Sequence, residues 1–67
     1  MSVARVSEII AMSEISFDDA LAQGVARAHK TLKNVRSVWI HDQSVAVEEG
    51  KIVAYKLSLK VTFVLAD

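Results

Sequence analysis

The chain has 67 residues, no cysteine, and eight basic against eight acidic side chains, so its formal net charge is zero. These values exclude a disulfide framework and a thiolate metal site, and they argue against electrostatic attraction to nucleic acid or to an anionic membrane. A chain this short buries only about 60 % of its unfolded surface, so its own core supplies only marginal stability. Self-association is therefore favoured. We expect residues 1–67 to form one domain. No apolar run is long enough to span a membrane and no basic segment precedes one, so we expect a cytoplasmic protein.

The segment Val3–Met12 is predicted to form a first strand. Towards its end, Ile9 and Ala11 lie on one face while Ile10 and Met12 lie on the other. Apolar groups on both faces favour burial on both sides of this part of the strand.

A helix is expected next, beginning after Ser16 and running to about Asn34. Ser16 is a good N-cap with Asp19 at the N3 position, close to a capping box, and Asn34 suits a left-handed stop. The apolar residues of this segment fall at helical spacing and form one stripe, which we expect to face the sheet: Phe17, Leu21, Gly24, Val25, Ala28 and Leu32.

The segment Val35–Val47 is predicted to form a second strand with an irregularity. Its apolar residues occupy even positions at first, as at Ile40, and then odd positions, as at Val45. A change of parity within a strand indicates a bulge or bend, which we place near Asp42–Ser44.

The longest alternating pattern lies in Lys51–Asp67, where the odd positions from Val53 to Leu65 are apolar. Fully extended, such a strand would reach roughly 50 Å. One small domain is narrower than that, so the strand must twist and overhang its own subunit. The turn Glu48–Gly50 closes the hairpin before it, with Gly50 supplying a positive φ.

The order of elements is therefore strand, helix, strand, strand, which is an α+β fold. A right-handed crossover puts the first strand parallel to the second. The third strand then fits between them, antiparallel to both, in a sheet of order 1-3-2 curled around one helix. Leu21, Leu59 and Phe63 are expected to fill the space between sheet and helix.

Several motifs in the same order along the chain resemble the dodecin family. They are the helix entry Ser16–Ala20, the helix stretch Val25–Asn34, the pair Asp42-Gln43, the hairpin Glu49–Lys51 and the strand Tyr55–Phe63. The resemblance covers nearly the whole chain and implies a β-α-β-β subunit that assembles through trimers into a hollow homododecamer. It also implies storage or buffering rather than catalysis. Many members bind flavins stacked in pairs between tryptophans, and some bind coenzyme A.

Two positions depart from the flavin contacts that the resemblance implies. Ser37 stands where the stacking tryptophan is expected, and Lys56 replaces the glutamine that hydrogen-bonds the isoalloxazine. A serine has no aromatic face, and a lysine offers only donors. We therefore expect little flavin binding, although Asp42 and Gln43 keep their places in the motif.

Trp39 has two interpretations. It lies two residues after Ser37 and so points to the same face of the strand. It is either an anchor at a subunit interface or a stacking surface in a shifted ligand pocket. The candidate cofactor-binding set at or near the family's flavin pocket is Ser37, Trp39, Asp42, Gln43 and Lys56.

The remaining charged residues suggest weaker sites. His29 and His41 lack the paired spacing of a zinc site, and we assign no metal ligands. Acidic side chains in the second strand and its turn could offer oxygens to a hard cation or could simply be solvated, namely Asp42, Glu48 and Glu49. Basic side chains on the helix could hold a phosphate or form a solvated face, namely Arg27, Lys30 and Lys33.

Two functions remain open. No Ser–His–Asp grouping, glycine-rich phosphate loop or catalytic carboxylate pair is present, so an enzyme is not expected and no catalytic residue is assigned. The first function is a small-ligand sequestration protein that forms a hollow homo-oligomeric shell. The second is a structural or calcium-binding shell with no organic ligand, since the resemblance implies calcium binding in some relatives without the tryptophan. The sequence fixes no cofactor: little flavin binding is expected, and calcium and coenzyme A follow only from the resemblance.

Overall fold

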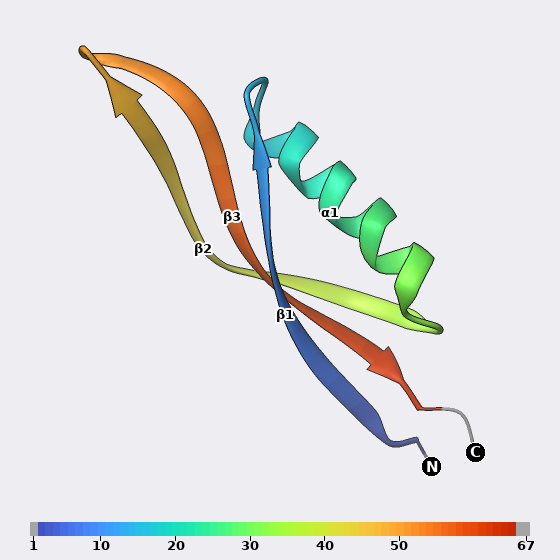
Figure 1. The fold of residues 1–67 in the computed structure, drawn as a ribbon. Coiled ribbons are helices and arrows are strands. Elements are labelled where there is room, and N and C mark those ends of the chain that lie inside the picture. The colour runs from blue at the N-terminus through green and yellow to red at the C-terminus, as the bar shows by residue number, and fades with distance from the viewer. Residues whose placement is uncertain (1, 66–67) are drawn as a thin grey trace.

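The computed structural model describes residues 2–65 (Figure 1). The elements are β1 (Ala4–Ser13), α1 (Phe17–Thr31), β2 (Val35–Glu48) and β3 (Lys51–Val64). The strand order is β1-β3-β2, and β3 is antiparallel to both neighbours. The predicted β-α-β-β topology and the 1-3-2 order are confirmed. Among the described residues, no helix has the length and apolar character needed to cross a membrane.

The helix ends at Thr31, three residues before the predicted stop. Leu32 already has extended backbone angles, although its N–H still donates to the Ala28 carbonyl over 2.8 Å. Asn34 does adopt the left-handed conformation, with φ 61°, but it does so in the turn that leads into β2. Its carbonyl accepts from the Val64 N–H at 3.1 Å. Asn34 therefore starts the pairing with β3 instead of ending the helix.

The strands agree with the predicted segments to within a residue or two at their starts. β1 and β2 each extend one residue beyond the predicted end. The third strand was predicted to continue to Asp67, but residues 66–67 lie outside the described part of the chain. β3 itself ends at Val64.

The predicted N-cap of α1 is confirmed, but the capping box is not closed. Ser16 Oγ accepts from the Asp19 N–H at 3.0 Å. The Asp19 carboxylate accepts instead from Ser13 Oγ and from Gln23 Nε2, both at 2.6 Å. Ser13 Oγ also accepts from the Ile15 N–H at 2.9 Å. The buried Ser13 hydroxyl therefore ties the end of β1 to the first turn of the helix.

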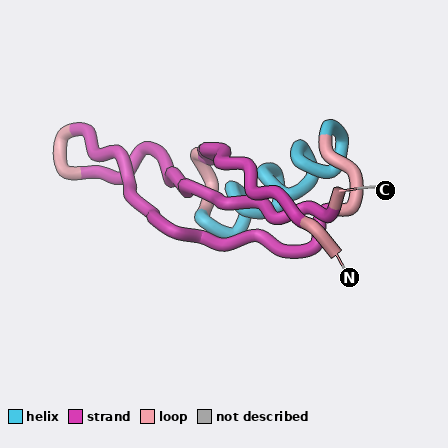
Figure 2. Tube along the Cα trace, turned by 90° about the horizontal axis from the view of Figure 1, so that it is seen from below, coloured by secondary structure: helices cyan, strands magenta, loops and turns pink. Residues whose placement is uncertain are grey.

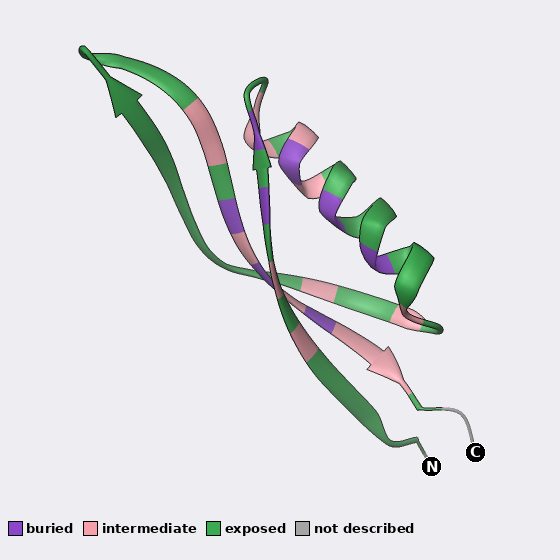
Figure 3. Cartoon of the chain, viewed as in Figure 1, coloured by how far each residue is buried: buried purple, intermediate pink, exposed green. Residues whose placement is uncertain are grey.

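The core lies between α1 and one face of the sheet (Figures 2 and 3). The fully buried large side chains are Leu57, Leu59 and Val61, all from the middle of β3. The prediction for Leu59 is confirmed. Leu21 and Phe63 are only half-buried, although Leu21 still packs against the core cluster.

The helix contacts the sheet through small residues, namely Ala20, Gly24 and Ala28. A Cβ added at Gly24 would lie 2.8 Å from Leu59 Cδ1 and 3.2 Å from Ala11 Cβ. The two layers are therefore too close for a side chain at this point. The predicted contact stripe was wrong for Val25, which is exposed, because the close approach is made one position earlier on the helix.

A bulge in β2 changes the parity of the strand. The register shifts between Ile40 and Asp42, just before the predicted stretch Asp42–Ser44, and two further shifts lie nearer the ends of β2. Ile40 before the bulge and Val45 after it both lie opposite odd-numbered residues of β3. The bulge therefore keeps Ile40 and Val45 on one face, as the parity change predicted, whereas the last register shift, between Ala46 and Val47, places Val47 opposite the even-numbered Ile52.

Beyond the helix, β2 and β3 continue as a curved hairpin (Figure 1). The described chain measures 51 × 19 × 13 Å, so the overhang predicted from the length of β3 is confirmed. The two turn residues are Glu49 and Gly50, with φ of 51° and 77°. Positive φ was predicted for Gly50 and is confirmed, but Glu49 adopts it as well. We call residues 45–53 the overhanging hairpin.

Candidate functional site

The sheet face opposite α1 carries most of the predicted site residues, and we call it the outer face. Even-numbered residues of β3 point to it, because the odd-numbered ones are buried under the helix. Ser37 pairs with Thr62 and Trp39 pairs with Lys60, so both belong to the outer face. The prediction that Ser37 and Trp39 share a face is confirmed.

The bulge divides the other candidates between the two faces. Asp42 pairs with Ser58 and therefore lies on the outer face together with Lys56. Gln43 pairs with Leu57 and has the parity of the helix-facing side. The Gln43 N–H donates to Asp42 Oδ1 at 2.9 Å, a local bond that holds the backbone beside the bulge. Four of the five predicted residues thus share the outer face, and Gln43 does not.

The centre of the outer face holds four side chains in contact, which we call the outer-face cluster: Glu8, Trp39, His41 and Lys60. Glu8, Lys60 and Trp39 form one row across β1, β3 and β2. Lys60 Nζ lies 5.1 Å from the centroid of the Trp39 ring. His41 Nε2 lies 2.7 Å from Glu8 Oε1, and its ring centroid is 5.8 Å from that of Trp39. The contact between Glu8 and His41 links β1 to β2 across β3, which lies between them.

Sequence reasoning missed Glu8 and Lys60 as members of this cluster. Two sequence features could have identified them: the predicted strand order and the alternation of side chains along each strand. Both residues occupy even positions on strands predicted to be neighbours. The register that puts them in one row with Trp39 depends on the pairing of all three strands. His41 was interpreted as a surface or interface histidine, and it is the residue displaced by the bulge.

The cluster can recognise a planar, negatively charged group. Trp39 is 62 % exposed, so much of the indole surface is open to a ligand or a neighbouring chain. Aromatic faces stack on planar rings and attract cations. Lys60 supplies a positive charge next to the Trp39 ring. The carboxylate of Glu8, at the β1 end of the row, is paired with His41.

The rest of the outer face is apolar and exposed. On β1, the side chains of Val6, Ile10 and Met12 are each more than half exposed. Burial on both faces of this strand was predicted, and within one chain it is wrong, because only the helix side, at Ala11, is covered. α1 lies on a single face of the sheet and leaves the other without cover (Figure 3).

The acidic side chains of the described residues lie too far apart to form a metal site within one chain. Within residues 2–65, no group of three His, Cys, Asp or Glu side chains lies close enough together to hold an ion. Asp42 lies beside the bulge, whereas Glu48 and Glu49 lie at the hairpin turn. The three carboxylates are thus spread from the bulge in β2 to the hairpin turn.

The sequence profile of the family described as Dodecin matches residues 3–66. The chain belongs to the dodecin family. It is 33 % identical over 63 residues to the calcium dodecin of Mycobacterium tuberculosis. The matched stretch covers 94 % of this chain and 89 % of the relative. The resemblance predicted from the motifs is confirmed.

Solved dodecin structures have the same fold as this dodecin. The structure of dodecin from Streptomyces coelicolor matches with a TM-score of 0.92 at 26 % identity, covering 98 % of this chain and 94 % of the other. The crystal structure of the calcium-chelating calcium dodecin from Mycobacterium tuberculosis matches with a TM-score of 0.82 at 35 % identity, covering 97 % and 93 %. That protein is described as having a novel calcium-binding site.

Proposed function

We propose that this dodecin is a non-enzymatic, cytoplasmic protein that sequesters a small ligand inside a homododecameric shell built from trimers. Its partner is itself, with no role in binding nucleic acid or membrane. The observation that carries the proposal is the exposed Trp39 ring with Lys60 Nζ at 5.1 Å from its centroid. An exposed indole beside a cation favours a planar, anionic, nucleotide-like ligand.

The shell is supported by the exposed apolar surface of the subunit. Six large apolar side chains on the sheet are more than half exposed in one chain, namely Val6, Ile10, Met12, Trp39, Val47 and Ile52. Surface of this kind marks an interaction site. Sedimentation at micromolar concentration should show a homododecamer, and a stable folded monomer or dimer would contradict the proposal.

Flavin itself should bind weakly, because Ser37 and Lys56 occupy the positions of the family's tryptophan and glutamine. Stacking of a base on an aromatic side chain contributes about 1–3 kcal/mol, and each 1.4 kcal/mol is about tenfold in affinity. We expect a colourless protein and riboflavin affinity at least tens-fold below that of flavin-binding relatives. A yellow protein, or quenching of riboflavin fluorescence at submicromolar concentration, would contradict this.

The role of Trp39 can be separated from its effect on assembly. If Trp39 is the stacking surface, Trp39→Ala abolishes binding of coenzyme A, measured by calorimetry, while the shell stays intact. Trp39→Phe is the matched control, since it keeps an aromatic face and should retain part of the affinity. Loss of the shell in Trp39→Ala, with no binding of coenzyme A to the wild type, would instead make Trp39 an interface anchor.

A second candidate function is calcium binding in a shell without an organic ligand. It is favoured by the 33 % identity to a calcium dodecin. Because the acidic side chains of one chain are spread out, such a site would combine carboxylates from neighbouring subunits. Calorimetric titration with Ca²⁺ tests it: binding to the wild type that is lost in Asp42→Asn or Glu48→Gln supports this function, and no heat of binding rejects it.

A further inference from the structure

Lys60 lies between two possible partners on the outer face. Glu8 is the residue directly opposite it on β1, and Trp39 is the residue directly opposite it on β2. Side chains of opposite charge at such positions ordinarily form a cross-strand pair. A pair with Glu8 would neutralise the lysine, whereas a position over the Trp39 ring leaves its charge available to a ligand.

The structure shows the second arrangement. Lys60 Nζ lies 5.1 Å from the centroid of the Trp39 ring. The Glu8 carboxylate instead contacts His41, with 2.7 Å between Oε1 and Nε2, and across residues 2–65 no other basic side chain contacts an acidic one. Asp42, the next carboxylate along the outer face, accepts from a backbone N–H beside the bulge at 2.9 Å. Within that range, Lys60 thus has no carboxylate partner, although an acidic residue is its direct neighbour.

The bulge in β2 explains why His41 can reach Glu8. The register shifts between the two residues that flank His41, so it is the extra residue without a partner on β3. Its side chain is 26 % exposed, and its ring centroid lies 5.8 Å from that of Trp39. At an exposed site, a cation on an aromatic ring and an ion pair are comparable in strength. A third group that holds Glu8 therefore decides which contact Lys60 makes.

We infer that His41 is a specificity-determining residue of the ligand site. By holding Glu8, it keeps the charge of Lys60 at the Trp39 ring, so that the site selects anionic over neutral planar ligands. This inference rests on the proposed function and names the residue that sets its charge preference. His41 acts through Glu8 and Lys60, so it is a positioning residue. A merely structural role would change the binding of charged and neutral ligands alike, whereas this role changes the difference between them.

Two probes of nearly the same shape test the inference. Naphthalene-2-sulfonate is an anion, and naphthalene-2-sulfonamide is uncharged at neutral pH. Calorimetry measures both affinities, and the wild type should bind the sulfonate more tightly. In His41→Ala the sulfonate affinity should fall by about three- to tenfold, the effect of one unit charge about 6 Å away in largely aqueous surroundings. The sulfonamide affinity should stay close to that of the wild type.

A second substitution should reverse the loss. Adding Glu8→Gln to His41→Ala should restore the sulfonate affinity, because an amide cannot neutralise Lys60. Lys60→Met should abolish the preference for the sulfonate, and His41→Ala should not change the preference further in that background. A crystal structure of His41→Ala should show Lys60 Nζ within about 4 Å of the Glu8 carboxylate. An unchanged preference in His41→Ala, or no recovery with Glu8→Gln, would overturn the inference and leave the proposed function standing.

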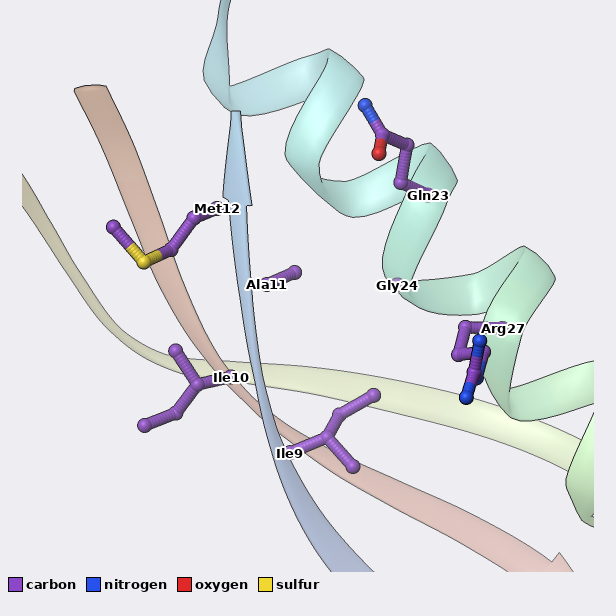
Figure 4. A pocket seen from close by; sticks show the side chains of 7 residues that line it. All are labelled: Ile9, Ile10, Ala11, Met12, Gln23, Gly24 and Arg27. Atoms are coloured by element: carbon purple, nitrogen blue, oxygen red, sulfur yellow. The ribbon is translucent and has the colours of Figure 1, made fainter. Parts of the chain in front are cut away.

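A second surface that suits an aromatic anion supplies the control. A groove of about 310 Å³ lies between β1 and α1, and none of the four residues of the outer-face cluster lines it (Figure 4). It is apolar along β1, and Gln23 and Arg27 line it from the helix. Arg27→Gln should leave the binding of both probes unchanged. Loss of sulfonate binding in this variant would place the probe in the groove and overturn the inference. A wild type that binds neither probe would contradict the proposed ligand site and the inference together.

Discussion

The two halves of β3 belong to one continuous strand but have different surroundings. In the half under α1, Leu57, Leu59 and Val61 are fully buried, whereas Ile52 and Val53 in the overhanging hairpin are exposed. Alternation of apolar residues therefore specifies a strand and its faces, but not which layer covers them. The half under the helix is covered by its own chain, and we propose that the other half is covered by a neighbouring subunit of the shell. Substitutions in the two halves should accordingly affect different measurements.

The largest expected effect comes from Leu59→Ala in the helix-covered half. Leu59 is 0 % exposed, so the substitution removes buried methyl groups and leaves a cavity. The free energy of unfolding should fall by about 2–5 kcal/mol per subunit. Denaturant titration at a fixed subunit concentration measures it. A midpoint that barely moves would mean that the core does not lie under the helix.

An intermediate effect is expected for Gly24→Ala. The new Cβ would meet Leu59 Cδ1 at 2.8 Å, and Leu59 is fully buried and cannot move aside freely. Overpacking costs about 1–3 kcal/mol, and the gain in helix propensity offsets about 1 kcal/mol of it. We expect a net loss of about 1 kcal/mol in the free energy of unfolding. The control Gln23→Ala, at an exposed neighbour, should change it much less, and a stabilised Gly24→Ala protein would contradict the close approach.

The smallest effect on the core is expected for Ile52→Ala in the overhanging hairpin. Ile52 lies outside the hydrophobic core cluster, so the subunit core should be unchanged. Hydrogen exchange at the Leu57 and Leu59 amides should remain as slow as in the wild type, because exchange there reports opening of the core. In Leu59→Ala the same amides should exchange faster. Equal acceleration in both variants would show that the two halves of β3 are one cooperative unit.

Most of the fold could be predicted because its determinants are local. The alternation in β3, the N-cap at Ser16 and the parity change in β2 are each read within a few residues. The contact face of α1 was predicted less well. A prediction from hydrophobic spacing favours large apolar residues such as Val25 as contact residues. The distance between helix and sheet depends instead on the absence of a side chain at Gly24.

The candidate site was predictable only where it follows one strand. Ser37 and Trp39 share a face because successive side chains alternate. Gln43 separates from them because the bulge comes just before it, at a position that the parity change located only to within a few residues. The contact between Glu8 and His41 joins strands that are far apart in sequence, so it depends on the register of the whole sheet.

Trp39 is the only tryptophan in the chain, and it lies beside a lysine and a histidine on the outer face. Its intrinsic emission therefore reports on that face alone, without an added label. A shift of the emission towards the blue would indicate that water has left the indole, and collisional quenching by iodide would show how far the ring stays accessible after subunits associate. The protein thus carries its own optical probe at the position where ligand binding and assembly have to be told apart.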